Sequence, residues 1–226
     1  MKGKSEGKSG EKVFVSWSGG KDAYLALLKA REQGLNVYTL ATFISMDGKS
    51  MSHALHPGLL QEQAAALGLP LEVERVTWES YEDGFMRLTS RLKEKGIRGG
   101  VFGDINLSQH REWVEKACGR VALAPYLPLW GMKEKEVLAE LLGRGARLVV
   151  VSLRSDLLDE KWLGKEIDDD FCEMCVRKGI SPCGENGEYH TLVVDGPLFK
   201  SPVRFRRGGT FKEKDHLFLK IKPGSG

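Results

Sequence analysis

A glycine-rich loop between a buried strand and a helix constrains the fold of this chain more than any other feature. The apolar run 13–17 predicts the strand, and the apolar spacing across 24–28 predicts a helix that ends near Gly34. The segment 18–22, Ser-Gly-Gly-Lys-Asp, separates them. Glycines let the backbone approach an anion, and a helix N-terminus directs its amide groups toward it. The pattern therefore predicts an anion-binding loop at the carboxyl end of the first strand of an α/β sheet.

The alternation of strands and helices continues along the first two thirds of the chain. Further strands are expected at 37–44, 71–76, 100–103 and 147–152, with helices at 57–67, 81–96, 108–118 and 133–142. A polar loop spans 45–56, and a proline-rich stretch surrounds Pro125 and Pro128. Strands that alternate with amphipathic helices require parallel pairing with right-handed crossovers. We therefore expect an α/β fold, an open doubly wound parallel sheet, over the first 152 residues.

The pattern changes after Ser155. Short helical segments are expected on either side of 168–170, followed by strands near 190–195, 202–207 and 216–222. This predicts a smaller α+β C-terminal subdomain. The expected organisation is a flexible tail at 1–12, a domain at 13–153 that holds the anion-binding loop, and the subdomain at 154–226.

Composition bounds the class of protein. The chain has 226 residues, enough for one to two domains with a substantial core. It has no apolar run of about 18 residues, and its first 12 residues are polar. A cytoplasmic location is expected. Four cysteines are too few for a disulfide scaffold, so free thiols or a metal site remain as alternatives.

The net charge of +3 is distributed unevenly along the chain. Residues 200–226 carry eight Lys or Arg and two acidic residues, and the 187 residues between the two basic ends sum to about −5. This profile is not that of a protein coated by nucleic acid. Basic and apolar residues alternate near the C-terminus, at Arg204, Arg206, Arg207, Lys220 and Lys222. The alternation predicts a charged face on antiparallel strands, either solvated or docked to an anionic macromolecule.

The anion-binding loop is neither of the two common nucleotide motifs. A Walker loop would need glycine at Val15 and a hydroxyl residue at Asp22, and no G-x-G-x-x-G pattern occurs here. Lys21 adds a cationic donor, and Asp22 can orient a metal ion or a loop amide.

A second motif lies about 165 residues further along, at 182–191 (Pro-Cys-Gly-Glu-Asn-Gly-Glu-Tyr-His-Thr). Glu185 and Glu188 stand three residues apart between glycines, which fits a tight loop that presents acids to a ligand or to Mg²⁺. Alone, the same pattern fits an acidic hairpin turn.

Together the two motifs resemble the diphthine–ammonia ligase family of N-type ATP pyrophosphatases, from Val13 to about Val203. Supporting matches are 101–104 (Val-Phe-Gly-Asp), 110–113 (His-Arg-Glu-Trp) and 128–131 (Pro-Leu-Trp-Gly). The resemblance implies the Rossmann-type fold of adenine nucleotide alpha hydrolases, with ATP and Mg²⁺ as cofactors. It further implies that a substrate carboxylate attacks the α-phosphorus of ATP to form an acyl-adenylate, which ammonia then converts to an amide.

The resemblance also assigns roles to residues. The ATP-binding residues would be Ser16, Ser18, Gly19, Gly20, Lys21 and Asp22. Asp22 and Asp104 would hold Mg²⁺. Catalytic roles fall to Asp104, Glu185, Glu188 and His190, with His190 as the base that takes a proton from the amine. Substrate contacts fall to His53, His110 and Arg111. The C-terminal subdomain would bind the substrate.

Two departures from the family pattern bear on the substrate. The first loop usually ends in Ser or Thr, where this chain has Ala23. The second motif usually reads Glu-Gly-Gly-Glu-aromatic-Glu-Thr, where this chain has Asn186 and His190. That variant resembles a sister branch with a proposed role in the amide chemistry of cobalamin salvage.

Other functions fit parts of the sequence. Related enzymes thiolate tRNA, which would give Cys172 and Cys175 a sulfur-transfer role, and a non-catalytic adenine-nucleotide sensor would need only the first loop. Cys172, Cys175, Cys183 and His190 have a superficial zinc spacing, whereas a helical cysteine pair on a core face explains the first two without metal. Cys118 is expected in the core. As partners we expect a small-molecule or protein carboxylate and ammonia, with no nucleic acid and no membrane, and a homodimer is one candidate assembly.

Overall fold

The computed structural model describes residues 10–51 and 55–224. The chain divides into two compact units. Of the described residues, the first comprises 10–17, 22–48 and 69–132, and the second comprises 18–21, 49–51, 55–68 and 133–224. Among the described residues, no helix is both long enough and apolar enough to cross a membrane.

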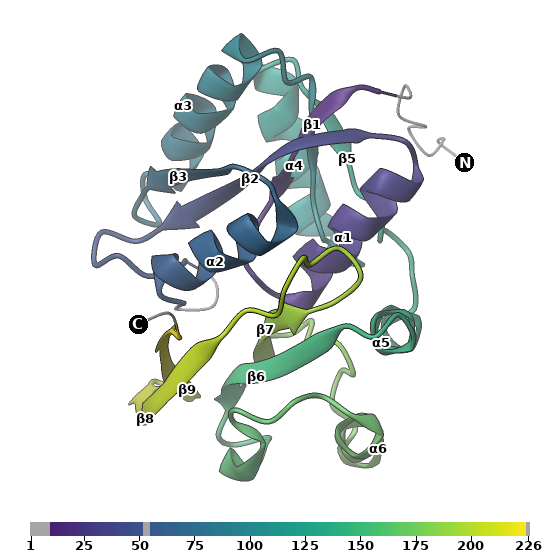
Figure 1. The fold of residues 1–226 in the computed structure, drawn as a ribbon, viewed down its shortest axis with the longest axis vertical. Coiled ribbons are helices and arrows are strands. Elements are labelled where there is room, and N and C mark those ends of the chain that lie inside the picture. Colours follow the sequence, from purple (N-terminus) through teal and green to yellow (C-terminus); the bar gives the residue numbers. More distant parts are fainter. Residues whose placement is uncertain (1–9, 52–54, 225–226) are drawn as a thin grey trace. The chain divides into compact units, whose positions relative to one another are not determined.

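The first unit contains a five-stranded parallel sheet in the order β3-β2-β1-β4-β5. Its strands are β1 (Lys12–Ser16), β2 (Asn36–Ile44), β3 (Leu71–Arg75), β4 (Gly99–Val101) and β5 (Ala124–Tyr126). The helices between them are α1 (Lys21–Glu32), α3 (Tyr81–Glu94) and α4 (Ser108–Arg120), as Figure 1 shows. The expected α/β parallel sheet is confirmed. Strand order reverses between β1 and β4, and open sheets of this kind bind ligands outside the carboxyl ends of the strands at such a point.

The edge strand β5 was not predicted from the sequence, which shows only a proline-rich stretch there. Pro125 lies in the middle of β5 and pairs with Gly100 of β4. Proline has no N–H to donate, so it is tolerated in a sheet only at an edge. The position of β5 at the end of the strand order explains how a strand forms there.

The second unit contains a four-stranded antiparallel sheet in the order β7-β6-β9-β8. Its strands are β6 (Arg147–Arg154), β7 (Tyr189–Asp195), β8 (Phe205–Glu213) and β9 (His216–Pro223). Its helices are α2 (Pro57–Leu67), α5 (Glu134–Gly143) and α6 (Asp169–Lys178), with a short 3-10 helix at Glu160–Trp162.

The strand expected at 147–152 forms, but its placement in the parallel sheet was wrong. It is β6, which pairs with β7 and β9 in antiparallel fashion. Residues 148–153 are all buried, so this strand has no alternation of polar and apolar residues. A continuous apolar run fits a buried strand of either sheet type, and periodicity alone does not distinguish them.

Helix α2 has clear sequence signals at both ends. Nδ1 of His56 accepts a hydrogen bond from the N–H of Gly58, Pro57 occupies the first turn, and Gly68 ends the helix in the left-handed conformation. The buried stripe of α2 includes one polar side chain, Gln63, which is fully buried.

Candidate functional site

The loop Ser18–Lys21, which follows β1, has a backbone conformation that requires glycine. Gly19 has φ +83°. A Cβ at Gly19 would lie 2.7 Å from Cδ2 of Leu60 and 2.8 Å from Oε1 of Gln63. The left-handed backbone favours glycine here, and a Cβ would require the ends of the Leu60 and Gln63 side chains to shift.

Three residues from distant parts of the sequence fix this loop. Nε2 of Gln63 donates to the carbonyl oxygens of Gly19 (2.9 Å) and Val193 (2.7 Å). The N–H of Lys21 donates to Oγ1 of Thr191 (3.1 Å), and the N–H of Val193 donates to the Gly19 carbonyl (3.0 Å). The loop is thus held by α2 and β7. Neither Gln63 nor Thr191 was predicted from the sequence as a site residue. A polar residue within the apolar stripe of α2 was the signal that could have found Gln63.

Lys21 brings a positive charge into the interior of the second unit. The residue is 4% exposed, and its Nζ lies 5.8 Å from the ring centroid of Tyr189. A buried ammonium group is costly unless it has charged or polar partners. The N–H of Gly19 donates to no group among the residues that the structure describes. A glycine amide and a buried cation two residues apart, at the start of a helix, fit a phosphate group.

The other predicted loop residues lie where the chain enters and leaves this turn. Oγ of Ser18 accepts a hydrogen bond from the N–H of Gly20 (3.3 Å), which tightens the turn. Ser16 is the last residue of β1. Lys21 begins α1, with Asp22 in its first turn.

In the first unit, Asp22 and Asp104 lie close to each other. A Cβ at Gly103 would be 2.8 Å from the backbone carbon and 2.9 Å from the carbonyl oxygen of Asp22, so glycine allows the segment after β4 to pack on the first turn of α1. Burial raises the pKa of Asp104, and the negative charge of Asp22 acts in the same direction. His110 opposes both, with its Nδ1 3.2 Å from Oδ1 of Asp104.

This pair of carboxylates can hold a divalent cation. Hard oxygen ligands are those that Mg²⁺ prefers, and Mg²⁺ commonly uses one or two carboxylates together with water and phosphate. Within 10–51 and 55–224, no group of three or more His, Cys, Asp and Glu side chains is arranged to bind a metal. Like the N–H of Gly19, the N–H of Ala23, which follows Asp22, has no hydrogen-bond acceptor among the described residues.

Two further residues, Arg111 and His53, were predicted to contact the substrate. Nε of Arg111 is 2.7 Å from Oε1 of Glu115, one turn further along α4, and its guanidinium lies 5.0 Å from the ring centroid of Trp130. Arg111 therefore packs against its own helix and one aromatic ring. His53 lies outside the described residues.

The second motif forms a loop at 181–190 that Glu188 holds together. Glu188 is 5% exposed, and its Oε2 accepts a hydrogen bond from the N–H of Asn186 (2.9 Å). Its Oε1 accepts from Nδ2 of Asn186 (3.1 Å) and from the N–H of Ser181 (3.4 Å). The side chain of Asn186 thus supplies one of the donors to Glu188. Glu185 donates its N–H to Oγ of Ser181 (3.1 Å) at the start of the loop.

Two histidines lie at the end of this loop. The rings of His190 and His216 stack with centroids 6.3 Å apart, and Nε2 of His216 is 2.8 Å from the Gly187 carbonyl oxygen, to which it donates. Burial lowers the pKa of His190 to about 4, and the charges of Lys21 and His216 act in the same direction. His190 is therefore neutral at neutral pH. His216 was not predicted from the sequence, because it belongs to no motif.

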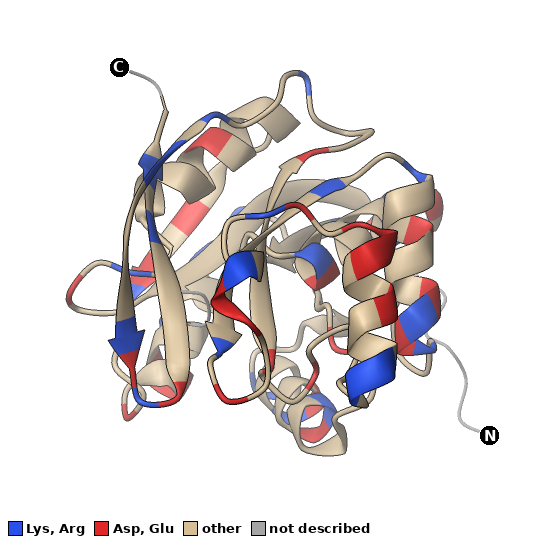
Figure 2. Ribbon diagram, turned by 90° about the horizontal axis from the view of Figure 1, so that it is seen from below, with Lys and Arg blue, Asp and Glu red and all other residues tan. Residues whose placement is uncertain are grey.

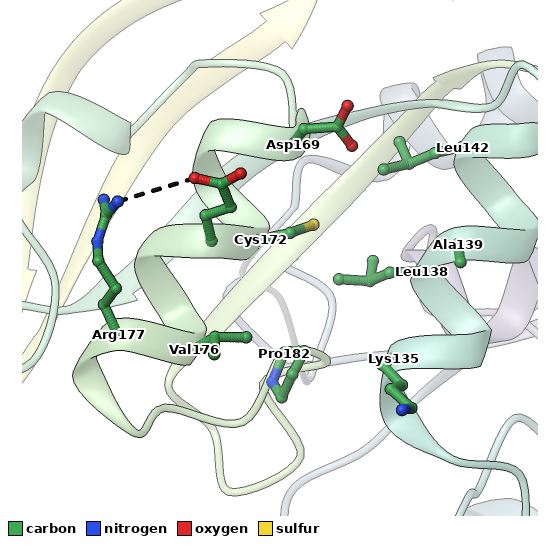
Figure 3. Close-up of a pocket in the computed structure, with 10 residues that line it drawn as sticks. Lys135, Leu138, Ala139, Leu142, Asp169, Cys172, Val176, Arg177 and Pro182 are labelled. Carbon is green, nitrogen blue, oxygen red and sulfur yellow. Dashed lines mark ion pairs between the residues drawn. The ribbon is translucent and has the colours of Figure 1, made fainter.

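The cysteines occupy separate environments. Cys118 is buried in α4, and burial raises its pKa to about 12. Sγ of Cys183 donates to the Glu134 carbonyl (3.0 Å). Cys175 is buried, and burial raises its pKa to about 12. Cys172 lines a pocket of about 420 Å³ between α5 and α6, where its sulfur faces Leu138 and Leu142 (Figure 3). Burial raises the pKa of Cys172 as well, which disfavours the thiolate that sulfur transfer and zinc binding require.

Comparison with known proteins agrees with this geometry. Residues 11–125 match the family model of the diphthamide synthase N-terminal domain, and residues 133–225 match that of the diphthamide synthase C-terminal domain. The chain belongs to the diphthamide synthase family. Similar proteins include the diphthine–ammonia ligases of Rattus norvegicus (28% identity; 85% of this chain, 82% of the relative) and Danio rerio (27%; 90% of each). That of Homo sapiens is 26% identical, over 85% of this chain and 82% of the relative.

Family membership also decides between the classes of function. The diphthamide synthase relatives are ligases, so this chain is an enzyme of the ligase class rather than a nucleotide sensor. The resemblance noted in the sequence is confirmed.

Proposed function

We propose that this chain is an ATP-dependent amide ligase that adenylates a substrate carboxylate, releases pyrophosphate and forms an amide with ammonia. The observation that carries the proposal is the loop Ser18–Lys21, where a close-packed glycine with positive φ precedes a buried lysine at the start of α1. The names of the relatives support ammonia as the second substrate and a diphthine carboxylate as the class of acceptor.

Each group has a role in this reaction. The Gly19 amide and Lys21 would bind the phosphates that leave as pyrophosphate, and they stabilise the charge that develops there as the α-phosphorus is attacked. Mg²⁺, where bound, would supply further positive charge to the same phosphates. Asp22 and Asp104 would hold it, because a cation stabilises the charged form of Asp104, which burial and the charge of Asp22 disfavour.

His190 would take the proton that ammonia loses when it attacks the acyl carbon. With its pKa near 4, His190 is a weak base in the free protein. The charge of Lys21 is one cause of that low pKa. A phosphate bound to Lys21 would offset this charge, so the basicity of His190 would rise when ATP is bound. Glu188 would position His190 through the loop that it holds, and Glu185 would face the acceptor.

Product analysis tests the proposal. The purified chain is incubated with Mg-ATP, ammonium and a carboxylate acceptor, either a diphthine-bearing protein or a desalted small-molecule extract, and AMP is separated from ADP. We expect AMP and pyrophosphate in equal amounts, dependent on acceptor. Lys21→Met and Asp104→Asn should each lower the rate at least 100-fold, because both act on charge that develops in the transition state.

A matched control removes an exposed lysine of α4, Lys116→Met, and should leave the rate unchanged. Thermal unfolding of each variant separates lost activity from lost folding. ADP and phosphate as products would contradict the proposal, as would full activity in folded Asp104→Asn.

A further inference from the structure

The β8–β9 hairpin leaves one strand of the antiparallel sheet exposed. β8 is the edge strand, and its only strand partner within the described part of the chain is β9. Seven of its nine residues are exposed. Figure 2 shows Lys and Arg segments in blue along the strand that leads to the C-terminus, which is β9.

The register of the hairpin gathers its cations on one face. Arg206 lies directly opposite Lys222, and directly opposite residues of an antiparallel pair share a face. Lys220 shares that face because it is two residues from Lys222 in the same strand. Gly208 and Gly209 of β8 fall where the register shifts, opposite Lys220, so no side chain from β8 covers it.

Two stacked rings continue the same face. Phe211 pairs with Phe218, and their ring centroids are 5.0 Å apart at an interplanar angle of 14°. The Nζ atoms of Lys49 and Lys220 lie 5.0 and 5.8 Å from the centroid of Phe211. We call this face the cationic strip. It comprises Arg206, Lys222, Lys220, Lys49, Phe211 and Phe218.

The strip brings like charges next to one another. Like charges directly opposite each other on a sheet are destabilising, and Arg206 and Lys222 are such a pair. Neither they nor Lys220 form an ion pair with any residue within 10–51 and 55–224. An anion bound along this face would remove the repulsion.

The surroundings of the strip favour an extended peptide over a nucleic acid. Grooves that bind single-stranded nucleic acid combine cations with aromatic faces on which the bases stack. Here the two rings stack on each other, and lysines lie over Phe211. In contrast, the outer edge of β8 presents backbone N–H and C=O groups that can pair with an added strand. An added strand directs alternate side chains toward one face, where acids would meet Arg206 and Lys222.

We infer that the cationic strip docks an extended acidic segment of a protein partner along β8. The strip ends at His216 and the acidic Glu213, which lie directly opposite each other on the same face. His216 bonds to Gly187 and stacks on His190. A docked segment would therefore lie next to the loop at 181–190. The inference goes beyond the proposed ligase reaction, and its test involves no turnover.

Fluorescence anisotropy tests this docking with the full chain in the absence of nucleotide. The probe is a fluorescein-labelled ten-residue peptide of alternating Glu and Thr, and the comparison probe has Gln in place of every Glu. We expect Arg206→Glu combined with Lys222→Glu to weaken binding of the acidic peptide at least tenfold. The Gln peptide should bind the wild type at least tenfold more weakly than the Glu peptide does.

The matched control reverses two exposed cations elsewhere, Arg31→Glu with Lys116→Glu, and should change the Kd less than twofold. Arg206→Gln with Lys222→Gln should also lose binding while the free protein melts at a higher temperature, because the repulsion is gone. Equal losses in the hairpin and control variants would overturn the inference, and so would no binding by the wild type. Tighter binding of a ten-nucleotide oligouridylate than of the peptide would assign the strip to nucleic acid instead.

Discussion

The two loops of the candidate site are held in different ways. Ser18–Lys21 is fixed by residues far away in the sequence: the bonds from Gln63 and to Thr191 span 44 and 170 residues. In the loop at 181–190, Glu188 accepts hydrogen bonds from Asn186 and Ser181 of the same loop, and further bonds join the loop to Glu134, Arg154 and His216. The first loop therefore depends mainly on tertiary contacts, whereas the second combines local with tertiary contacts.

The difference has a consequence for tolerance to mutation. A loop clamped by α2 and β7 has little space to relax, so a small change there should affect folding and phosphate binding together. A loop held in part by its own hydrogen bonds can shift locally while the sheet around it remains intact. The same type of substitution should therefore have a larger effect in the first loop than in the second.

Gly19→Ala should have the largest effect. A Cβ at this position enters a left-handed backbone and overlaps Leu60 and Gln63. We expect the free energy of unfolding to fall by about 3 kcal/mol, from backbone strain and overpacking together. Urea denaturation measures it, and nucleotide binding by the folded fraction should weaken in parallel. A loss below about 1 kcal/mol would show that α2 moves away readily and that the clamp is weak.

Gln63→Leu should have the next largest effect. The substitution keeps the size of the side chain but leaves the carbonyl oxygens of Gly19 and Val193 without the Gln63 donor. A buried acceptor that loses its donor costs about 1–3 kcal/mol. The Gly19 carbonyl keeps its hydrogen bond from the N–H of Val193, which reduces the cost there. We therefore expect the free energy of unfolding to fall by about 2–3 kcal/mol. Gln61→Leu, on the exposed side of the same helix, is the matched control and should change stability by less than about 0.5 kcal/mol.

His190 connects the two loops, because it is the last residue of the second loop and the charge of Lys21 in the first loop lowers its pKa. Its pKa is about 4 in the folded chain and 6.5 in an unfolded one, so between these values the unfolded chain binds more protons. The contribution of neutral His190 to stability is complete above pH 6.5 and is lost as the pH falls toward 4. We expect this contribution to be about 2 kcal/mol.

Urea denaturation at several pH values measures this contribution as the difference between wild type and His190→Gln. The wild type should lose more stability than the variant over that interval. Parallel pH profiles of the two proteins would mean that His190 is solvated and that Lys21 does not influence it.

The same contrast explains what the sequence could predict. The parallel sheet, the glycine loop and the pair Asp22 and Asp104 follow from strand–helix alternation and from where strands end. Gln63, Thr191 and His216 act through contacts between segments that lie far apart in the sequence. No local pattern encodes such contacts, although a buried glutamine in an apolar stripe indicates that a hydrogen-bond partner exists.

The two errors in the fold predicted from the sequence have a related cause. Strand β6 is buried along 148–153, so nothing in its own residues reveals that its neighbours run antiparallel. Strand β5 contains a proline, which disfavours a strand anywhere except at an edge, and edge position is a property of the assembled sheet. In both cases the deciding information lies in the partner strands.

Gly187→Ala should have the smallest effect, and it completes the comparison. Gly187 also has positive φ, +79°, but a Cβ there would meet no atom within 4 Å. Only the backbone cost remains, so we expect a loss of about 1 kcal/mol in the free energy of unfolding. Gly187→Asn should cost less than Gly187→Ala, because asparagine adopts the left-handed region more readily. Urea denaturation of the three alanine and asparagine variants under one set of conditions provides the test. If Gly187→Ala destabilises the chain as much as Gly19→Ala does, the second loop is clamped as tightly as the first, and the distinction between the two loops does not hold.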